Sequence, residues 1–309
     1  QFNQQNNVTQ QNAITVEDLG VEKVRFTDSD SYMDLVIKTT DHTEPLGIDK
    51  NMPARFLLPL IDQKAASGFV NASLALDQAR AVKDIQEREL MRKASHLNDM
   101  AMAEITHFFK EGVTETDLAE QLKKIYRDLG ADGLSFEPLF AFGSNAASGH
   151  HWPDDTRLKP GDCILVDIGC TWEGYCSDMT RTFFYKNVTQ HQQEVYHTVL
   201  KANEEAEKAV TPGIPLSSLD QIARGIITDK GYGSAFTHRL GHFIGLEDHE
   251  FGDVSSASAD RAVPGNIFSI EPGVYLENDM GVRVEDLVLV TDHGHEILNH
   301  FSKELPVID

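Results

Sequence analysis

Long hydrophobic runs are absent from this sequence, and none approaches the roughly 20 apolar residues that a bilayer-spanning helix needs. Positive charge is also scarce, since 27 Lys and Arg stand against 49 Asp and Glu for a net charge of −22. Nucleic-acid binders usually carry a basic patch. The first residues, QFNQQNNVTQQN, lack the basic start and apolar core of a secretory signal. We therefore expect a cytoplasmic protein without nucleic-acid or membrane partners.

Cysteine is the third scarce residue type. Cys163, Cys170 and Cys176 lie close together in one segment, and their number is too small for a disulfide framework. Their spacing also differs from that of a structural zinc site. We expect three small buried residues, as suits a reducing compartment.

Apolar residues are plentiful enough for a sizeable core, since 40% of the 309 residues are hydrophobic and 25% are charged. The pattern of apolar residues along the sequence changes near residue 78. We therefore expect a small α/β domain over residues 1–77 and a larger domain over residues 78–309. In the larger domain, helical and strand-like segments alternate irregularly, which indicates an α+β fold. The predicted helices cover residues 78–109, 114–129, 190–210 and 217–230, and the predicted strands cover 266–270, 273–276 and 282–290.

A pair of aspartates lies in the segment DIGCTWEGYCSDMTRTF, residues 167–183. Apolar strand-like segments flank the Trp-Glu-Gly sequence at 172–174, which predicts a β-hairpin. If the turn is centred between the Trp and the Glu, Asp167 lies directly opposite Asp178. If it is centred one residue later, the two lie diagonally on the same face. Either register holds two like charges together beside apolar neighbours.

Three further segments carry imidazole or carboxylate groups in apolar surroundings. They are THRLGHFIGLEDHE with His238, His242 and His249, FSIEPGVYL with Glu271, and GVRVEDLVLV with Arg283 and Glu285. Taken singly, each group has an ordinary explanation as a core histidine, a turn residue or an ion pair. Burying an unpaired carboxylate costs several kcal/mol, however, and four carboxylates with one imidazole would each need such an explanation. A pair of divalent ions would offset the repulsion of all four carboxylates.

The donor set indicates the kind of ion. Four carboxylates and one histidine, without a thiolate, are mostly hard oxygen ligands, which favour Mn²⁺ or a similar six-coordinate ion over a structural zinc. Two such ions about 3.5–4 Å apart generate a bridging hydroxide and polarise a carbonyl or phosphoryl oxygen. We therefore expect hydrolysis, with two divalent ions per chain, Mn²⁺ as the first choice and Co²⁺ or Zn²⁺ as alternatives.

The order of the acidic and imidazole residues resembles the metal-ligand set of the pita-bread metallopeptidases, namely Asp167, Asp178, His242, Glu271 and Glu285. That family includes methionine aminopeptidase, aminopeptidase P and prolidase. The segments HRLGHFIGLEDHE, SIEPGVYL and GVRVEDLVLVT are most similar to the Xaa-Pro dipeptidase (prolidase) and aminopeptidase P branch, over about residues 84–290. The resemblance implies an α+β pita-bread domain over residues 78–309. It also implies a creatinase-type N-terminal domain, of which residues 1–77 resemble only the second half.

The resemblance assigns a role to each expected ligand. Asp178 and Glu285 correspond to residues that bridge the two ions. Asp167 corresponds to a ligand of one ion, and His242 with Glu271 to ligands of the other. Glu271 also corresponds to the residue that carries a proton from the bridging water.

Other residues correspond to groups that contact the substrate. His249 corresponds to a residue that steadies the scissile carbonyl or the oxyanion. His150, in SNAASGHHWP, corresponds to a substrate-facing histidine because it keeps the spacing to the following proline, and His151 is the alternative. His238 corresponds to a further pocket histidine and Arg283 to a residue that orients its strand and the neighbouring glutamate. For these last two a purely structural role is an equal alternative.

Two departures from the family pattern affect substrate recognition. Ser148-Gly149 stands where Leu-Pro is more usual, and Gly252-Asp253 stands where relatives have proline and sometimes a basic residue. The carboxylate of a dipeptide would then be met by Arg239, Arg261 or His238. We expect a homodimer, whose contacts the shortened N-terminal domain could weaken.

The expected function is hydrolysis of the peptide bond that precedes proline, first of all in Xaa-Pro dipeptides. An Xaa-Pro bond has no N–H and a fixed φ, so a pocket shaped for the ring can discriminate by fit. The alternatives are an aminopeptidase P that acts on longer Xaa-Pro peptides, a non-catalytic binding homologue, and a metal-free creatinase-like hydrolase. The substrates would be small peptides with proline in second place.

Overall fold

The computed structural model describes residues 27–309, and the chain divides between Ala75 and Leu76 into two compact units. The prediction about the first twelve residues concerns residues outside this described range. Within the described range, every helix is too short or too polar to cross a membrane.

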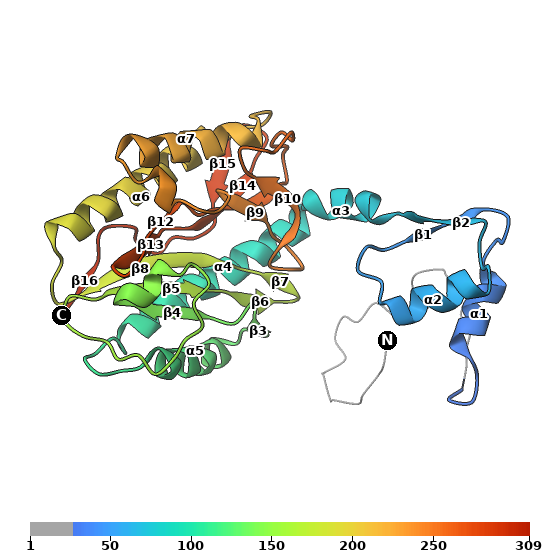
Figure 1. Ribbon diagram of the computed structural model, residues 1–309, viewed down its shortest axis with the longest axis horizontal. Coiled ribbons are helices and arrows are strands. Elements are labelled where there is room, and N and C mark those ends of the chain that lie inside the picture. The colour runs from blue at the N-terminus through green and yellow to red at the C-terminus, as the bar shows by residue number, and fades with distance from the viewer. Residues whose placement is uncertain (1–26) are drawn as a thin grey trace. The chain divides into compact units, whose positions relative to one another are not determined.

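The first unit, as described from residue 27, consists of short helices and two parallel strands (Figure 1). Its elements are α1 (Tyr32–Thr39), β1 (Pro45–Ile48), α2 (Ala54–Asp62) and β2 (Gly68–Asn71). A small core of Ile37, Ile48, Leu60 and Ala65 holds them together. The described part of this unit thus combines short helices with a pair of parallel strands.

The second unit contains four long helices and several sheets (Figure 1). After α3 (Ser73–Ala81), which begins before the division, the helices are α4 (Ile85–Thr106), α5 (Glu115–Leu129), α6 (Gln190–Ala209) and α7 (Leu216–Asp229), with short 3₁₀ turns η2 (Gly143–Ala147) and η3 (Gly233–Ala235). One sheet has the order β16 (Val307–Ile308), β8 (Met179–Tyr185), β5 (Cys163–Ile168) and β4 (Leu139–Phe142). A second has the order β10 (Glu250–Val254), β9 (Gly241–Phe243), β11 (Ile267–Ile270), β14 (Asp286–Val290) and β15 (His295–Ile297). Smaller sheets pair β12 (Gly273–Leu276) with β13 (Met280–Arg283), and β3 (Gly133–Leu134), β6 (Cys170–Trp172) and β7 (Tyr175–Cys176) with one another.

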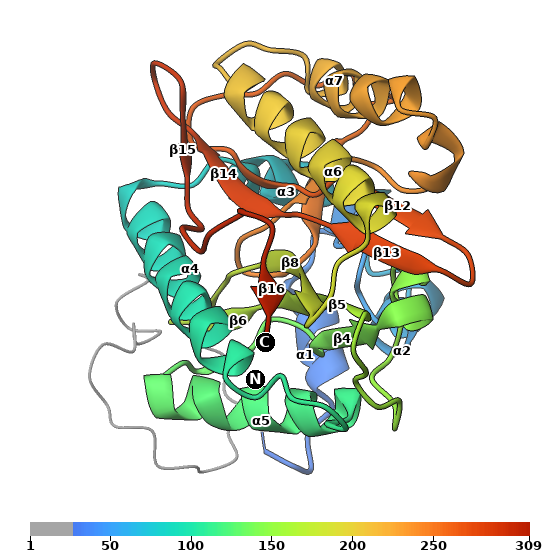
Figure 2. The same cartoon turned by 90° about the vertical axis from the view of Figure 1, so that its left-hand side faces the viewer.

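Helices cover the sheets of this unit from two sides, with α6 and α7 on one side and α4 and α5 on the other (Figures 1 and 2). Side chains alternate along β5, so its two faces join different cores. Ile164 and Val166 pack in the core that contains α4 and α5. Cys163 and Leu165 pack in the core that contains α6 and α7. Asp167, which follows this two-residue repeat, therefore shares the face that is turned towards the half with α6 and α7.

Several helix ends lie where capping residues predict them. The Thr114 hydroxyl accepts a hydrogen bond from the Asp117 amide at 3.0 Å and begins α5, while Gly130, with φ 81°, ends it. The bounds of α6 and α7 differ from the predicted 190–210 and 217–230 by one residue. The three cysteines are buried and free, which confirms their predicted state.

The prediction of one helix over residues 78–109 is wrong. The chain leaves the helical path between Ala81 and Ile85, and Asp84 caps the new helix by accepting the Glu87 amide hydrogen bond at 2.9 Å. The break lets Lys83 turn inwards, where its Nζ lies 2.8 Å from Glu250 Oε2. This buried ion pair joins residues far apart in sequence, so helical periodicity alone could not reveal it.

The prediction of one strand over residues 282–290 is also wrong, because two strands of different sheets occupy it. Arg283 of β13 pairs with Gly273, whereas Asp286 of β14 pairs with Ile270. Between them the Glu285 amide donates to the Thr180 carbonyl at 3.1 Å. The crossing between two sheets places Glu285 at their junction.

Candidate metal centre

The hairpin register fixes the relation between the two aspartates. Asp167 lies opposite Thr180, and the turn is formed at residues 173–174, which have φ angles of 46° and 86°. Asp178, two residues before Thr180, is therefore diagonal to Asp167. The second of the two registers considered from the sequence is confirmed.

Two glycines allow the backbone to approach closely beside these residues. At Gly169 a Cβ atom would lie 2.2 Å from the Ser177 carbonyl oxygen, and at Gly241 it would lie 1.9 Å from that of Ser269. Any larger residue would push the chains apart at both points. The second contact seats His242 beside β11, where its amide donates to Ser269 Oγ at 3.0 Å.

A cluster of carboxylates surrounds His242. Its Nε2 lies 3.4 Å from Asp178 Oδ2 and 3.5 Å from Glu271 Oε1. One ligand atom each from Asp178, His242 and Glu285 can be chosen so that all three lie within 4.8 Å of one another, which is close enough to hold a metal ion. The three come from the β8 hairpin, from β9 and from the β13–β14 junction, so the tertiary fold creates the cluster.

Arg283 joins Asp167 to this cluster. Its Nη2 donates to Asp167 Oδ2 at 2.6 Å and its Nε donates to Thr180 Oγ1 at 2.9 Å. Thr180 in turn donates to Glu285 Oε2 at 2.6 Å. The remaining Nη1 donates to the Tyr275 hydroxyl at 2.7 Å. One buried guanidinium thus holds two carboxylate-bearing segments in a fixed relation.

The cluster leaves several buried oxygens without partners. Among the described residues, none hydrogen-bonds to Asp167 Oδ1, Asp178 Oδ1 or Glu285 Oε1, although these atoms are buried. Unpaired buried acceptors are costly, and ionised ones are more so. Divalent cations bound in this cluster would satisfy such atoms, so the residues fit the ions that the resemblance implies.

The pKa directions lead to the same conclusion. Burial, and then neighbouring carboxylates, raise the pKa values of Asp178 and Glu285 well above their usual range. Burial likewise raises the pKa of Glu271 to about 7. Burial, and then the neighbouring His249 ring, lower the pKa of His242 to about 3, which keeps the imidazole neutral and able to coordinate. A bound cation would favour the ionised carboxylates.

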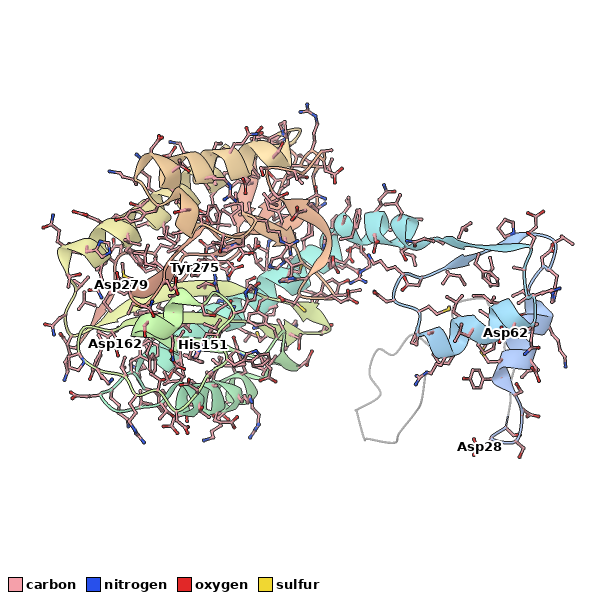
Figure 3. All side chains as sticks on the ribbon, in the orientation of Figure 1. Asp28, Asp62, His151, Asp162, Tyr275 and Asp279 are labelled. Carbon is pink, nitrogen blue, oxygen red and sulfur yellow. The ribbon has the colours of Figure 1, made fainter. Side chains whose placement is uncertain are left out.

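A cavity of about 610 Å³ opens onto this cluster. Every site residue expected from the sequence lines it, namely His150, Asp167, Asp178, His238, His242, His249, Glu271, Arg283 and Glu285. His151 and Tyr275, labelled in Figure 3, also contribute to the wall. The fold therefore brings the predicted residues together around one space.

The two candidate loop histidines differ in their surroundings. His151 Nε2 lies 2.7 Å from the fully buried Glu115 carboxylate, which also accepts the Phe142 and Asp154 amides at 2.8 and 3.1 Å. Glu115, His151 and Asp154 are close enough to hold a cation, but these hydrogen bonds already satisfy Glu115. His151 anchors the loop, whereas His150 is exposed at the cavity.

The other predicted side chains line the cavity walls. The His249 ring lies 3.9 Å from that of His242, measured between centroids. His238 Nε2 lies 3.0 Å from the Tyr275 hydroxyl, and burial followed by the charge of Arg283 lowers the pKa of His238 to about 4. Of the three candidates for a substrate carboxylate, Arg239 and His238 line the cavity. Arg261 is engaged elsewhere, since its Nη1 donates to the Gly213 carbonyl at 2.7 Å.

Sequence reasoning missed three polar residues of the site. Thr180 links Arg283 to Glu285, and Tyr275 links Arg283 to His238. Tyr275 is the polar member of the apolar strand GVYL, and this contrast was the available signal. The third is Asp248, which lines the cavity directly before His249.

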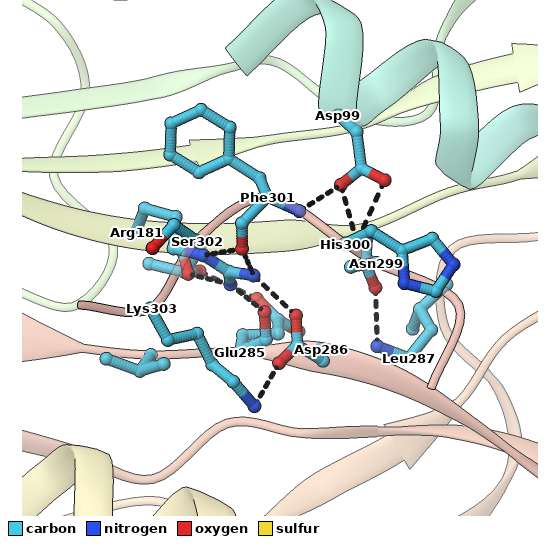
Figure 4. A network of polar contacts seen from close by, with 12 residues as sticks. Asp99, Arg181, Glu285, Asp286, Leu287, Asn299, His300, Phe301, Ser302 and Lys303 are labelled. Atoms are coloured by element: carbon cyan, nitrogen blue, oxygen red, sulfur yellow. Dashed lines mark hydrogen bonds and ion pairs between the residues drawn. The ribbon is translucent and has the colours of Figure 1, made fainter. Parts of the chain in front are cut away.

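A buried ionic network lies behind the junction of β13 and β14 that carries Glu285 (Figure 4). Arg181 donates to Asp286 Oδ1 at 2.6 Å and to the Glu285 carbonyl at 2.6 Å. Lys303 Nζ lies 2.8 Å from Asp286 Oδ2 and 2.7 Å from Glu207 Oε2. The network ties the C-terminal segment and α6 to the backbone at Glu285.

This network predicts a pH-dependent stability. Burial, and then Asp286, raise the pKa of Glu207 from its ordinary 4.5 to about 8, so the folded state holds a proton there that the unfolded state releases. Stability should therefore fall as the pH rises from about 5 to 8. Glu207→Gln should remove the part of this slope that Glu207 causes, while the buried carboxylates of the metal centre keep their part, and the variant should gain on the order of a few kcal/mol over wild type at pH 9. Urea unfolding at several pH values measures it.

The matched control is Glu205→Gln, which removes an exposed carboxylate from the same helix. It should keep the slope of the wild-type protein. Equal pH profiles for the Glu207→Gln variant and the wild type would show that Glu207 is ionised in the folded state.

The comparison with known proteins agrees with the fold. The model of metallopeptidase family M24 matches residues 89–292, and the chain belongs to this family. An uncharacterized peptidase of Staphylococcus aureus (strain MW2) is 41% identical over 244 residues, which cover 79% of this chain and 70% of the relative. The α+β pita-bread fold expected from the sequence is confirmed.

The solved structures that are similar to this chain include a prolidase and an X-Pro aminopeptidase. The prolidase from Thermococcus sibiricus has a TM-score of 0.89 and 33% identity, covering 94% of this chain and 81% of that one. The X-Pro aminopeptidase from Thermotoga maritima has a TM-score of 0.84 and 31% identity, covering 93% and 82%. This chain is thus similar to proteins of both branches.

Proposed function

We propose that the chain is a dinuclear metallopeptidase that hydrolyses the bond before proline, in Xaa-Pro dipeptides first of all. The observation that carries the proposal is the set of buried carboxylate oxygens around His242 that lack a hydrogen-bond partner within residues 27–309 and that a pair of cations would satisfy together. Membership of family M24 and the similarity to a prolidase support it. Mn²⁺ is the proposed metal because the donor atoms are mostly carboxylate oxygens.

The proposed ligands are those expected from the sequence. Asp178 and Glu285 would be the ligands shared between the two ions, and Asp167, whose Oδ2 lies 2.6 Å from Arg283 Nη2, would hold one of them. His242 and Glu271 would hold the other ion, and His242 Nε2 lies 3.5 Å from Glu271 Oε1. When bound, two ions would lower the pKa of a shared water and polarise the scissile carbonyl.

The chain's own groups position the substrate around that centre. Glu271, whose Oε1 accepts a hydrogen bond from Ser269 at 3.1 Å, faces the cavity and can take up and return a proton. His249, which lines the cavity, would donate to the carbonyl oxygen as negative charge develops on it. His150 is the proposed substrate-facing histidine, because His151 is bound to Glu115. Arg239, at the cavity wall, is the proposed partner of the dipeptide carboxylate.

The test combines metal analysis with paired substrates. Protein reconstituted with Mn²⁺ should contain two ions per chain and cleave Ala-Pro faster than Ala-Pro-Ala, and Ala-Ala should be a poor substrate. Removal of the metal with a chelator should abolish turnover, and Mn²⁺ or Co²⁺ should restore it.

Each other outcome has a definite meaning. Faster cleavage of the tripeptide would favour an aminopeptidase P, and bound metal without cleavage of either peptide would favour a binding homologue. Failure to bind any divalent ion would overturn the proposed function. The homodimer and the cytoplasmic location stay predictions.

A further inference from the structure

Asp248 is a carboxylate of the cavity that the resemblance does not assign to the metal centre. It lies in the loop between β9 and β10, and its side chain is 21% exposed. Its Oδ1 is buried and, within residues 27–309, lacks a hydrogen-bond partner, while its Oδ2 lies 3.5 Å from His249 Nε2. Like the proposed ligands Asp167, Asp178 and Glu285, Asp248 therefore has a buried carboxylate oxygen that no described residue hydrogen-bonds.

The loop is held so that Asp248 points inwards. Glu250, whose side chain is 4% exposed, accepts the Leu246 amide at 2.9 Å and pairs with the buried Lys83 at 2.8 Å. Arg80 Nη2 lies 2.6 Å from the same carboxylate. Glu247, directly before Asp248, has a side chain that is 59% exposed. The two neighbouring acids therefore point in opposite directions, one into the cavity and one towards solvent.

The charge of Asp248 acts on the proposed ligands. Asp248 lines the same cavity as Asp167, Asp178 and Glu271, so these carboxylates repel one another when they are ionised. Such mutual repulsion is relieved by a cation that all of them face.

We propose that Asp248 is a further metal-facing carboxylate, which strengthens cation binding beside Asp178 and His242. This inference rests on the proposed dinuclear centre. Asp248 raises the negative charge facing the ions, and removing that charge should weaken their binding. In the metal-free protein the same charge only adds to the repulsion. Asp248 should therefore stabilise the loaded protein and destabilise the empty one.

The experiment compares Asp248→Asn, Asp248→Glu and Glu247→Gln with wild type. Each protein is stripped of metal and titrated with Mn²⁺ in a calorimeter, and its metal-free melting temperature is recorded. Asp248→Asn should bind Mn²⁺ about 10- to 100-fold more weakly and should melt at a higher temperature when metal-free. Asp248→Glu keeps the charge and should retain most of the affinity. Glu247→Gln, an exposed charge of the same loop, should behave like wild type in both measurements.

The outcomes separate this inference from the proposed function. If wild type binds Mn²⁺ and Asp248→Asn matches Glu247→Gln in affinity, the role of Asp248 is refuted while the metal centre stands. If Asp248→Asn folds poorly, Asp248→Glu is compared with wild type instead. This variant keeps the negative charge, so tenfold weaker Mn²⁺ binding by it would refute a role of Asp248 that depends on charge. If wild type itself binds no divalent ion, the proposed function fails and this inference fails with it.

Discussion

Asp178→Ala is expected to fold, to lose the dinuclear centre and to lose at least about 1,000-fold in turnover. Asp178 is 4% exposed and lies between His242 and Glu285, so a shared ligand of both ions would be removed. The loss of several kcal/mol of metal assistance corresponds to a rate factor of roughly this size. Metal content by mass spectrometry and turnover of Ala-Pro measure the two effects separately.

Removing Asp178 also removes one member of a repelling buried group, so the metal-free variant should not melt below metal-free wild type. Asp128→Ala, an exposed aspartate on α5, is the control and should keep both metal and turnover. Wild-type metal content and turnover in Asp178→Ala would refute its assignment as a shared ligand.

His249→Ala is expected to keep both ions but to lower turnover roughly 100-fold, the scale of losing one oxyanion donor. Its ring lies against that of His242, 3.9 Å away between centroids, and its side chain is 59% exposed towards the cavity. This position suits a group that meets the substrate. Single-turnover kinetics with Ala-Pro, together with metal analysis, distinguish slower chemistry from lost metal.

His293→Ala provides the comparison, because His293 is an exposed histidine in the loop between β14 and β15. It should leave turnover and metal content unchanged. A His249→Ala protein that has lost an ion would show instead that His249 is a ligand, and the assignment of roles would have to change.

Local sequence signals predicted the helices well where capping residues occur. Thr114 and Gly130 set the ends of α5 because side-chain hydrogen bonds and left-handed backbone are properties of single residues. The break between Ala81 and Ile85 could not be predicted in this way. It depends on Lys83 reaching Glu250 across the fold, and the two are distant in sequence.

In the site, too, local sequence signals predicted some features, and contacts between distant residues determined the others. The spacing of Asp167 and Asp178 followed from strand alternation, and only the hairpin turn decided between two registers. Glu285, in contrast, was expected within a continuous strand, while the structure places it where the chain passes from one sheet to another. Asp248 gave no sequence signal of its own, because its direction depends on the contacts of Glu250.

The two helix-covered halves of the second unit supply different parts of the centre. Asp167 and Asp178 come from the hairpin of the first half, and His242, Glu271 and Glu285 come from the second. Under the proposed function, neither half could retain the ions alone. Two fragments obtained by cutting the chain before α6 should each be inactive when separate. Adding Mn²⁺ should favour their reassociation, because the ions would be held by ligands from both fragments.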